Sequence, residues 1–184
     1  MNAPVRGVMA VKLLAFAGLF SLFHFAYDWA PSAVTAVFSG IDESVFQHAK
    51  IGWFAWLAAS ALEWGLVRPR RGARLDFVAT RLWGAGFAVG LFTAAWYLAP
   101  AIAGPLPNDA VEILWAFFAL ICGGTPAIAL EGQLAHAPLP RSLRIGAFVF
   151  AAIALFLFLR FTAEPPWVDL FAPPRLWDGP GGAP

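Results

Sequence analysis

Five long apolar segments, separated by short polar breaks, constrain the fold of this chain more than any other feature. A helix rises about 1.5 Å per residue and the hydrocarbon core of a bilayer is about 30 Å thick, so about 20 apolar residues cross it. The segments of this length are residues 8–29, 47–67, 77–98, 110–134 and 143–161. Single segments cross lipid only as helices, because lipid offers the backbone no hydrogen-bond partner. We therefore predict an all-α fold, a bundle of five transmembrane helices.

The composition agrees with a lipid surrounding. Hydrophobic residues make up 60% of the 184 residues and charged residues 12%. Soluble domains carry about 25% charged residues, so the polar surface of this chain is too small to face water on all sides. The net charge of +1 gives no reason to expect a nucleic-acid partner. Cys122 is the single cysteine, which excludes an intramolecular disulfide.

The basic residues predict an orientation. They flank the first segment and fill two of the breaks: Arg6, Lys12, Arg68, Arg70, Arg71, Arg74, Arg81, Arg141 and Arg144. With five spans these regions all lie on one side, and basic residues favour the cytoplasm. We therefore predict a cytoplasmic N-terminus and a C-terminus outside. The first apolar run continues through Tyr27, longer than the apolar part of a usual signal peptide, so we expect that it is not cleaved.

The chain divides into two regions. Residues 1–164 form the predicted transmembrane domain, and residues 165–184 form a Pro-rich extracytoplasmic tail. The prolines of the tail forbid a long helix. Its aromatic residues Trp167, Phe171 and Trp177 indicate that it lies along the outer membrane interface, where indole rings are favoured.

Acids, hydroxyls and imidazoles concentrate in two stretches, residues 24–29 (HFAYDW) and 41–50 (IDESVFQHAK). With the predicted topology both stretches lie at the outer end of the first two helices. Spacings of four residues place side chains on one helix face. The pairs with this spacing are His24 with Asp28, Ser44 with His48, and Glu43 with Gln47. Glu43 and His48 are about 140° apart on a helix, so they point to one spot only if the helix starts after Glu43.

One interpretation of these stretches is a metal site. Imidazoles and carboxylates bind divalent ions, which in catalytic sites keep an open position for water. The ligands would be His24, Asp28 and His48. Glu43, or Glu112 at the start of the fourth segment, would act as the acid or base. The same face would bind a ligand or a partner subunit through His24, Tyr27, Asp28, Ser44 and His48.

The alternative interpretation is structural. Asp42 is a natural N-cap, and Glu43 would lie in the first helical turn, where the helix dipole favours an anion. Asp109 would cap the fourth segment in the same way. His24 and His48 are least explained by this interpretation, because ionisable side chains within or beside the hydrocarbon tend to be functional.

Three ionisable residues lie near the predicted cytoplasmic ends of the segments. Glu63 and Glu131 need partners, because an unpaired charge in the membrane is costly. The expected partners are Arg68 or Arg81 for Glu63, and His136, Arg141 or Arg144 for Glu131. We expect Lys12 to extend to the cytoplasmic interface, keeping its ammonium group in water.

Three motifs resemble those of a family of uncharacterised prokaryotic five-helix membrane proteins, a domain of unknown function. They are residues 24–29 (His-Phe-x-Tyr-Asp-Trp), 42–50 (Asp-Glu-Ser-Val-Phe-Gln-His-x-Lys) and 161–166 (Phe-Thr-x-x-Pro-Pro). The family's second motif typically reads Asn-Glu-Ser-Val-Trp-Glu-His-x-Lys, so Gln47 replaces an acid. The resemblance implies a five-helix fold in the prokaryotic cytoplasmic membrane and carries no activity.

These observations lead to one main functional hypothesis and two others. The main hypothesis is a small integral membrane protein whose outer polar cluster binds a ligand, a metal ion or a partner membrane subunit. The second is a membrane-embedded metal-dependent enzyme acting on a lipid-like substrate, with a divalent metal ion as cofactor. The third is a small transporter, which needs a polar path from the outer cluster to Glu63 or Glu131. The middles of the first, second and fifth segments offer almost no polar atoms for such a path.

Overall fold

The computed structural model describes residues 3–104 and 106–171, and within these ranges the chain is helical without any strand. The helices are α1 (Ala3–Trp29), α2 (Ala33–Phe38), α3 (Val45–Val67), α4 (Arg74–Ala103), α5 (Asp109–Leu134) and α6 (Arg141–Ala163), with short 3-10 helices η1 (Arg71–Ala73) and η2 (Asp169–Phe171). The predicted all-α fold is confirmed.

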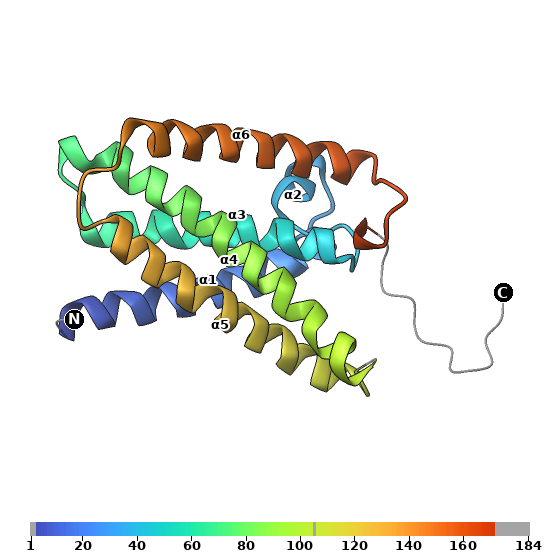
Figure 1. Ribbon diagram of the computed structural model, residues 1–184. Helices are drawn as coiled ribbons and strands as arrows, with labels where there is room; N and C mark the ends of the chain where they lie inside the picture. Colours follow the sequence, from blue (N-terminus) through green and yellow to red (C-terminus); the bar gives the residue numbers. More distant parts are fainter. Residues whose placement is uncertain (1–2, 105, 172–184) are drawn as a thin grey trace, which may run out of the picture.

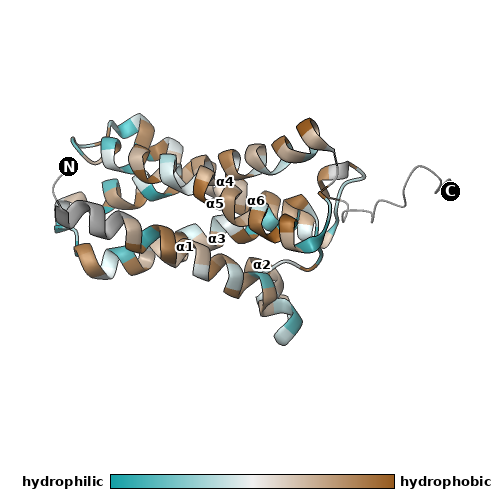
Figure 2. Ribbon diagram, turned by 90° about the horizontal axis from the view of Figure 1, so that it is seen from below, coloured by the Kyte–Doolittle hydropathy of each residue, from teal (hydrophilic) through white to brown (hydrophobic). Residues whose placement is uncertain are grey.

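The five long helices run along one axis in alternating directions (Figure 1). α3 occupies the centre and packs against α1 and α4. α5 packs against α4 and α1, whereas α6 lies on the outside against α4 and α2. Trp56 on α3 is fully buried and marks the middle of the core. Figure 2 shows apolar residues along the helices, with many hydrophilic residues toward the two ends of the bundle.

Four helical segments in the described chain are long and apolar enough to cross a membrane: Ala10–Trp29, Arg71–Ala103, Asp109–Leu134 and Arg141–Ala163. Large apolar side chains such as Leu14, Ile102 and Leu114 project outward from them and are at least 70% exposed. Such a surface suits hydrocarbon better than water. α3 is not among these four segments; it carries Gln47, Lys50 and other polar residues, which the surrounding helices bury.

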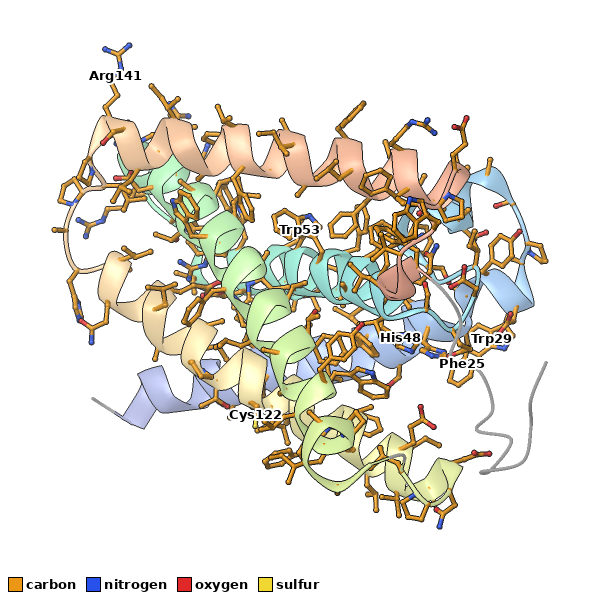
Figure 3. All side chains as sticks on the ribbon, turned by 45° about the vertical axis from the view of Figure 1, so that its right-hand side comes forward. Phe25, Trp29, His48, Trp53, Cys122 and Arg141 are labelled. Carbon is orange, nitrogen blue, oxygen red and sulfur yellow. The ribbon has the colours of Figure 1, made fainter. Side chains whose placement is uncertain are left out.

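The two ends of the bundle differ in chemistry. The basic end holds the α3–α4 turn at residues 68–73 and the α5–α6 connection at residues 135–140. The site end holds the α1–α3 connection and the α4–α5 connection. Figure 3 shows Arg141 at one end and His48, Phe25 and Trp29 at the other. Glu43 and the arginine-rich turn therefore lie at opposite ends of α3.

A buried ionic cluster ties four helices together near the basic end. Lys12 Nζ on α1 lies 2.5 Å from Glu131 Oε2 on α5 and 2.9 Å from Glu63 Oε2 on α3. Arg81 on α4 forms an ion pair with Glu63, and Trp56 Nε1 donates to Glu131 Oε1 at 2.9 Å. Two acids and two bases balance in charge, which is what a low-dielectric interior requires. Lys12, Glu63 and Glu131 are each less than 9% exposed.

The ionic cluster confirms one predicted partner and corrects two predictions. Glu63 pairs with Arg81, as expected. The prediction for Glu131 was wrong: its partner is Lys12, which is buried and does not extend to the interface. Glu131 points into the bundle because Gly84 on α4 has no side chain and leaves room for it. A Cβ added at Gly84 would collide with the Glu131 carboxyl group.

A dry aromatic layer separates the ionic cluster from the site end. Phe16 on α1 packs edge-on against Trp56 at 5.0 Å between ring centroids, and Phe20 packs against Phe92 of α4 at 5.7 Å. Leu120 of α5 completes the layer, and all five side chains are at most 5% exposed. On α1, α3, α4 and α5 these residues lie between the ionic cluster and the polar residues of the site end.

The described part of the tail packs against the bundle. Phe171 in η2 lies 4.6 Å from Phe46 and 5.2 Å from Phe161, measured between ring centroids. Trp167 is 96% exposed, which leaves it available to an interface. Trp177 lies outside the described residues, so the placement of the tail along the membrane stays a prediction.

We predict that Lys12→Met lowers the free energy of unfolding by about 3–5 kcal/mol, because it leaves Glu131 buried without its closest cation. Adding Glu131→Gln should recover part of this loss, since the amide keeps an oxygen for Trp56. Denaturant unfolding of the detergent-solubilised protein measures both. Arg160→Met breaks an exposed pair with Glu164 and should change stability by less than about 1 kcal/mol. Equal stabilities of Lys12→Met and Arg160→Met would contradict the assigned role.

Candidate metal centre

Local hydrogen bonds fold the chain back after α1 and bring the site together. Ser32 and Thr35 form a capping box that starts α2. Ser39 then closes α2 onto α1: its hydroxyl accepts from Tyr27 N at 3.0 Å and donates to Phe23 O. Ser39 is fully buried, so these bonds form away from water. We call this reversal, residues 30–39, the α1–α2 corner. It places the last turns of α1 beside the start of α3, and these turns carry His24.

The start of α3 differs from the predicted caps. Ser44, not Asp42, is the N-cap: its side chain accepts from Gln47 N at 3.3 Å. Asp42 Oδ1 instead accepts from Ser44 N at 2.8 Å and shapes the turn before the helix. Because α3 begins at Val45, Glu43 lies outside the helix and is free to point toward His48.

A similar shift occurs at α5. Asn108 is the N-cap, since its side chain accepts from Val111 N at 3.1 Å, and Asp109 is the first helical residue. The prediction that Asp109 caps this helix was therefore wrong. An amide provides the cap as well as a carboxylate does, so Asp109 and Glu112 are left in the first turn with their carboxylates unused by capping.

Three ligand atoms meet at the site end. His24 Nε2 and His48 Nε2 are 3.1 Å apart, and Glu43 Oε2 lies 3.4 Å from the first and 3.5 Å from the second. His24, Glu43 and His48 are the group of histidine and acidic side chains in the described part of the chain whose ligand atoms are close enough together to hold a metal ion. The three atoms come from the end of α1, the connecting loop and the first turns of α3.

The triangle of these atoms matches one face of a zinc coordination sphere. With bonds of about 2.0–2.1 Å, the edges of a tetrahedral site are about 3.3 Å long. The observed edges of 3.1, 3.4 and 3.5 Å bracket this length. His24, Glu43 and His48 would therefore hold a zinc ion at its usual bond lengths and leave one position for a further ligand.

Surrounding groups orient the ligands. His48 Nδ1 donates to Ser44 O at 2.9 Å, and since a carbonyl only accepts, the proton is on Nδ1. Bonds of this kind fix the tautomer of metal-binding histidines. In the neutral ring Nε2 then presents its lone pair toward His24 Nε2, which lies within hydrogen-bond distance at 3.1 Å. The His48 ring also stacks on Trp96, at 6.0 Å between centroids and 15° between planes. His24 Nδ1 has no hydrogen-bond partner among the described residues, and its ring packs against Phe25.

The electrostatics favour an ionised carboxylate in the triad. The contact with the imidazole of His24 lowers the pKa of Glu43, and the positive charges that His24 and His48 would carry act in the same direction, against the desolvation that raises it. Glu43 is therefore an anion at neutral pH, which is the form that binds a cation.

A cavity of about 530 Å³ adjoins the triad. It is mainly apolar, and its lining residues are Phe20, Ser21, His24, Phe25, Glu43, His48, Trp96, Asp109, Glu112, Ile113, Ala116, Phe117 and Leu120. Pockets of this size hold small molecules or cofactors. The site thus combines a set of metal ligands with space for a second molecule.

The predicted site residues separate into two groups. His24, His48 and Glu43 come together, and Glu112 lines the same cavity. Asp28 is exposed and lies outside the group of ligand atoms. Tyr27 contributes its backbone N–H to the α1–α2 corner, and Ser44 contributes the cap and the carbonyl that orients His48.

Sequence reasoning did not find the aromatic residues beside the triad or the role of Lys50. Trp96 lies on α4, far along the chain from both motifs, and nothing in its spacing ties it to His48. Lys50 is fully buried: its Nζ donates to Ala36 O at 2.7 Å and to Thr162 Oγ1 at 3.0 Å. It thereby joins α2, α3 and α6 near the start of α3.

No protein-family model, no curated protein and no solved structure matches this chain.

Proposed function

We propose that this protein is a multi-pass protein of the prokaryotic cytoplasmic membrane that binds one divalent metal ion, most suitably zinc, through His24, Glu43 and His48. The observation that carries the proposal is the triangle of ligand atoms, whose edges fit tetrahedral coordination. Two imidazoles and one carboxylate suit zinc well. The oriented tautomer of His48 and the ionised state of Glu43 support the same conclusion.

This proposal explains why the motif shared with the uncharacterised membrane family contains these residue types. In residues 42–50, the acid at the first position shapes the turn, Glu43 and His48 supply ligands, Ser44 orients His48, and Lys50 holds the neighbouring helices. Gln47, which departs from the family pattern, is buried; its side-chain oxygen has no hydrogen-bond partner among the described residues, and it lines a separate cavity with Asp42 and Phe171. Its side chain thus lies outside the group of metal ligands. We propose that the chain is a member of that family.

Five membrane crossings remain our proposal for the topology. α3 has 23 residues, enough to cross about 30 Å of hydrocarbon, and it lies between α1 and α4 in the centre of the bundle. Its polar side chains are buried by its neighbours, so they need not face lipid. The basic end would lie in the cytoplasm and the metal centre outside.

Site-directed labelling tests this topology. In a Cys122→Ser background, Ile41→Cys marks the site end and Arg70→Cys marks the α3–α4 turn. A membrane-impermeant maleimide added to intact cells should label the first variant, whereas the second should react only after the cells are lysed. Labelling of both positions from the same side would show that α3 does not cross the membrane.

Metal analysis tests the centre itself. The purified protein should bind about one zinc ion per chain, and His24→Ala, His48→Ala and Glu43→Gln should each weaken binding by about 100-fold or more, beyond the effect of losing a supporting hydrogen bond. Equilibrium dialysis followed by elemental analysis measures stoichiometry and affinity.

Two matched controls accompany these variants. His136→Ala removes the remaining histidine, at the basic end, and Asp28→Asn removes an acid one turn from His24. Both should keep full zinc binding. Loss of zinc in Asp28→Asn with retention in Glu43→Gln would overturn the assigned set of ligands in favour of His24, Asp28 and His48.

The cavity favours a second candidate function, metal-assisted hydrolysis of a lipid-like substrate. An ion with three protein ligands and an open position beside a cavity is typical of hydrolytic sites. A divalent ion held by His24, Glu43 and His48 would supply Lewis-acid chemistry toward an acyl carbonyl and toward water. Glu112, which lines the same cavity, would serve as the acid or base that takes up a proton from water and returns it to the leaving group.

A further inference from the structure

The cavity beside the metal centre is open to the surface that would face lipid. Phe25 on α1 and Ile113 and Phe117 on α5 form part of its wall. The same three side chains are 48%, 57% and 42% exposed. A hydrocarbon chain could therefore pass between α1 and α5 into the cavity without leaving an apolar environment.

The packing of α5 explains why the cavity lies at this end. At mid-length an added Cβ on Gly124 would collide with Leu13 of α1, and one on Gly123 would collide with Ala88 O of α4, so α5 packs closely against both helices. Toward the site end the α4–α5 hairpin diverges from α1 and α3 (Figure 1). The divergence leaves the cavity between the aromatic layer and the ends of the helices.

The charged side chains around the cavity are all acidic. Glu43, Asp109 and Glu112 line it, and no Lys or Arg of the described chain does. A divalent ion bound by Glu43 and two neutral imidazoles keeps a charge of one, which Asp109 alone balances, and Glu112 adds a further acid. The cavity thus has no net positive charge even with the ion bound and is negative without it, which disfavours phosphate and carboxylate head groups and favours a cation.

We infer that this cavity binds an amphiphile with a hydrocarbon chain and an ammonium head group, such as a long-chain amine or an amino lipid without phosphate. The chain lies along Phe20, Phe25 and Phe117, and the ammonium group lies beside Glu112 and Asp109. This inference rests on the membrane placement of the proposed function, and the ammonium selectivity does not require that the metal ion is bound. The bound molecule lies in the cavity that His24, Glu43 and His48 also line, so its class is also the substrate class of the site.

Photo-crosslinking of the full-length protein in detergent tests this inference. Three chain-matched probes carry a diazirine in the hydrocarbon chain and end in an amine, an alcohol or a carboxylate. Mass spectrometry of digested protein measures labelling of the α1 and α5 segments that line the cavity. The amine should label them saturably, with about tenfold higher apparent affinity than the alcohol, equivalent to about 1.4 kcal/mol, and the carboxylate should label least.

Variants connect this preference to the acids. Asp109→Asn with Glu112→Gln should reduce amine labelling to the level of the alcohol. Glu164→Gln is the matched control, because Glu164 lies at the same end of the bundle, outside the cavity, and is paired with Arg160. It should leave labelling unchanged. Ala116→Phe, which fills the cavity, should reduce labelling by the amine and the alcohol alike.

The outcomes separate this inference from the metal proposal. Equal labelling by the three probes, or a tenfold preference that survives Asp109→Asn with Glu112→Gln, would overturn the inference even if zinc binds as proposed. Selective amine labelling in protein that binds no zinc would support the inference and reject the metal centre. Repeating the crosslinking with zinc-free and zinc-loaded protein distinguishes these cases.

Discussion

The buried ionic cluster of Lys12, Glu63, Arg81 and Glu131 is the interaction on which the rest of the bundle depends. Isolated charges are not tolerated in a low-dielectric interior, so each of these groups requires the others. They come from α1, α3, α4 and α5, and one arrangement of these four helices brings all of them together. The cluster therefore sets how far each helix is displaced along its neighbours.

That register determines the geometry of the opposite end. His24 lies about 18 Å from Lys12 along α1, and His48 lies about 22 Å from Glu63 along α3. Because the two helices are antiparallel and the distances are similar, pairing Lys12 with Glu63 also brings the two histidines face to face. The aromatic layer lies between the ionic cluster and the histidines, and it keeps water and charge out of the middle of the bundle. The polar chemistry is thus gathered in two separate zones, and the cavity of about 530 Å³ lies at the site end.

The sequence was sufficient to predict the class of fold and the location of the polar cluster. Apolar length predicted long helices, and the reversal of direction between the first two of them placed both histidines at the same end of the bundle. The sequence also predicted that Glu43 can reach His48 only if the helix begins after Glu43. The structure satisfies this condition, because α3 begins at Val45. The N-caps were wrong because Ser44 and Asn108 compete with neighbouring acids for the same role, and spacing alone does not rank them.

Other features depend on contacts between distant parts of the chain. The pairing of Lys12 with Glu131 follows from close packing at Gly84, and the stacking of Trp96 on His48 follows from the register of α4. Neither leaves a local pattern. The number of membrane crossings also depends on such contacts. The central helix α3 carries polar side chains, and it suits a lipid surrounding only if its neighbours bury them, as they do in the structure.

The central claim is that two imidazoles and one carboxylate at the outer end of the first two long helices hold a metal ion. X-ray absorption spectroscopy of the zinc-loaded protein tests it most directly. A shell of about four nitrogen and oxygen atoms at about 2.0–2.1 Å, including two imidazoles, is the predicted result. A sulfur ligand at about 2.3 Å, which only Cys122 or a methionine would provide, or a shell without imidazole, would contradict it.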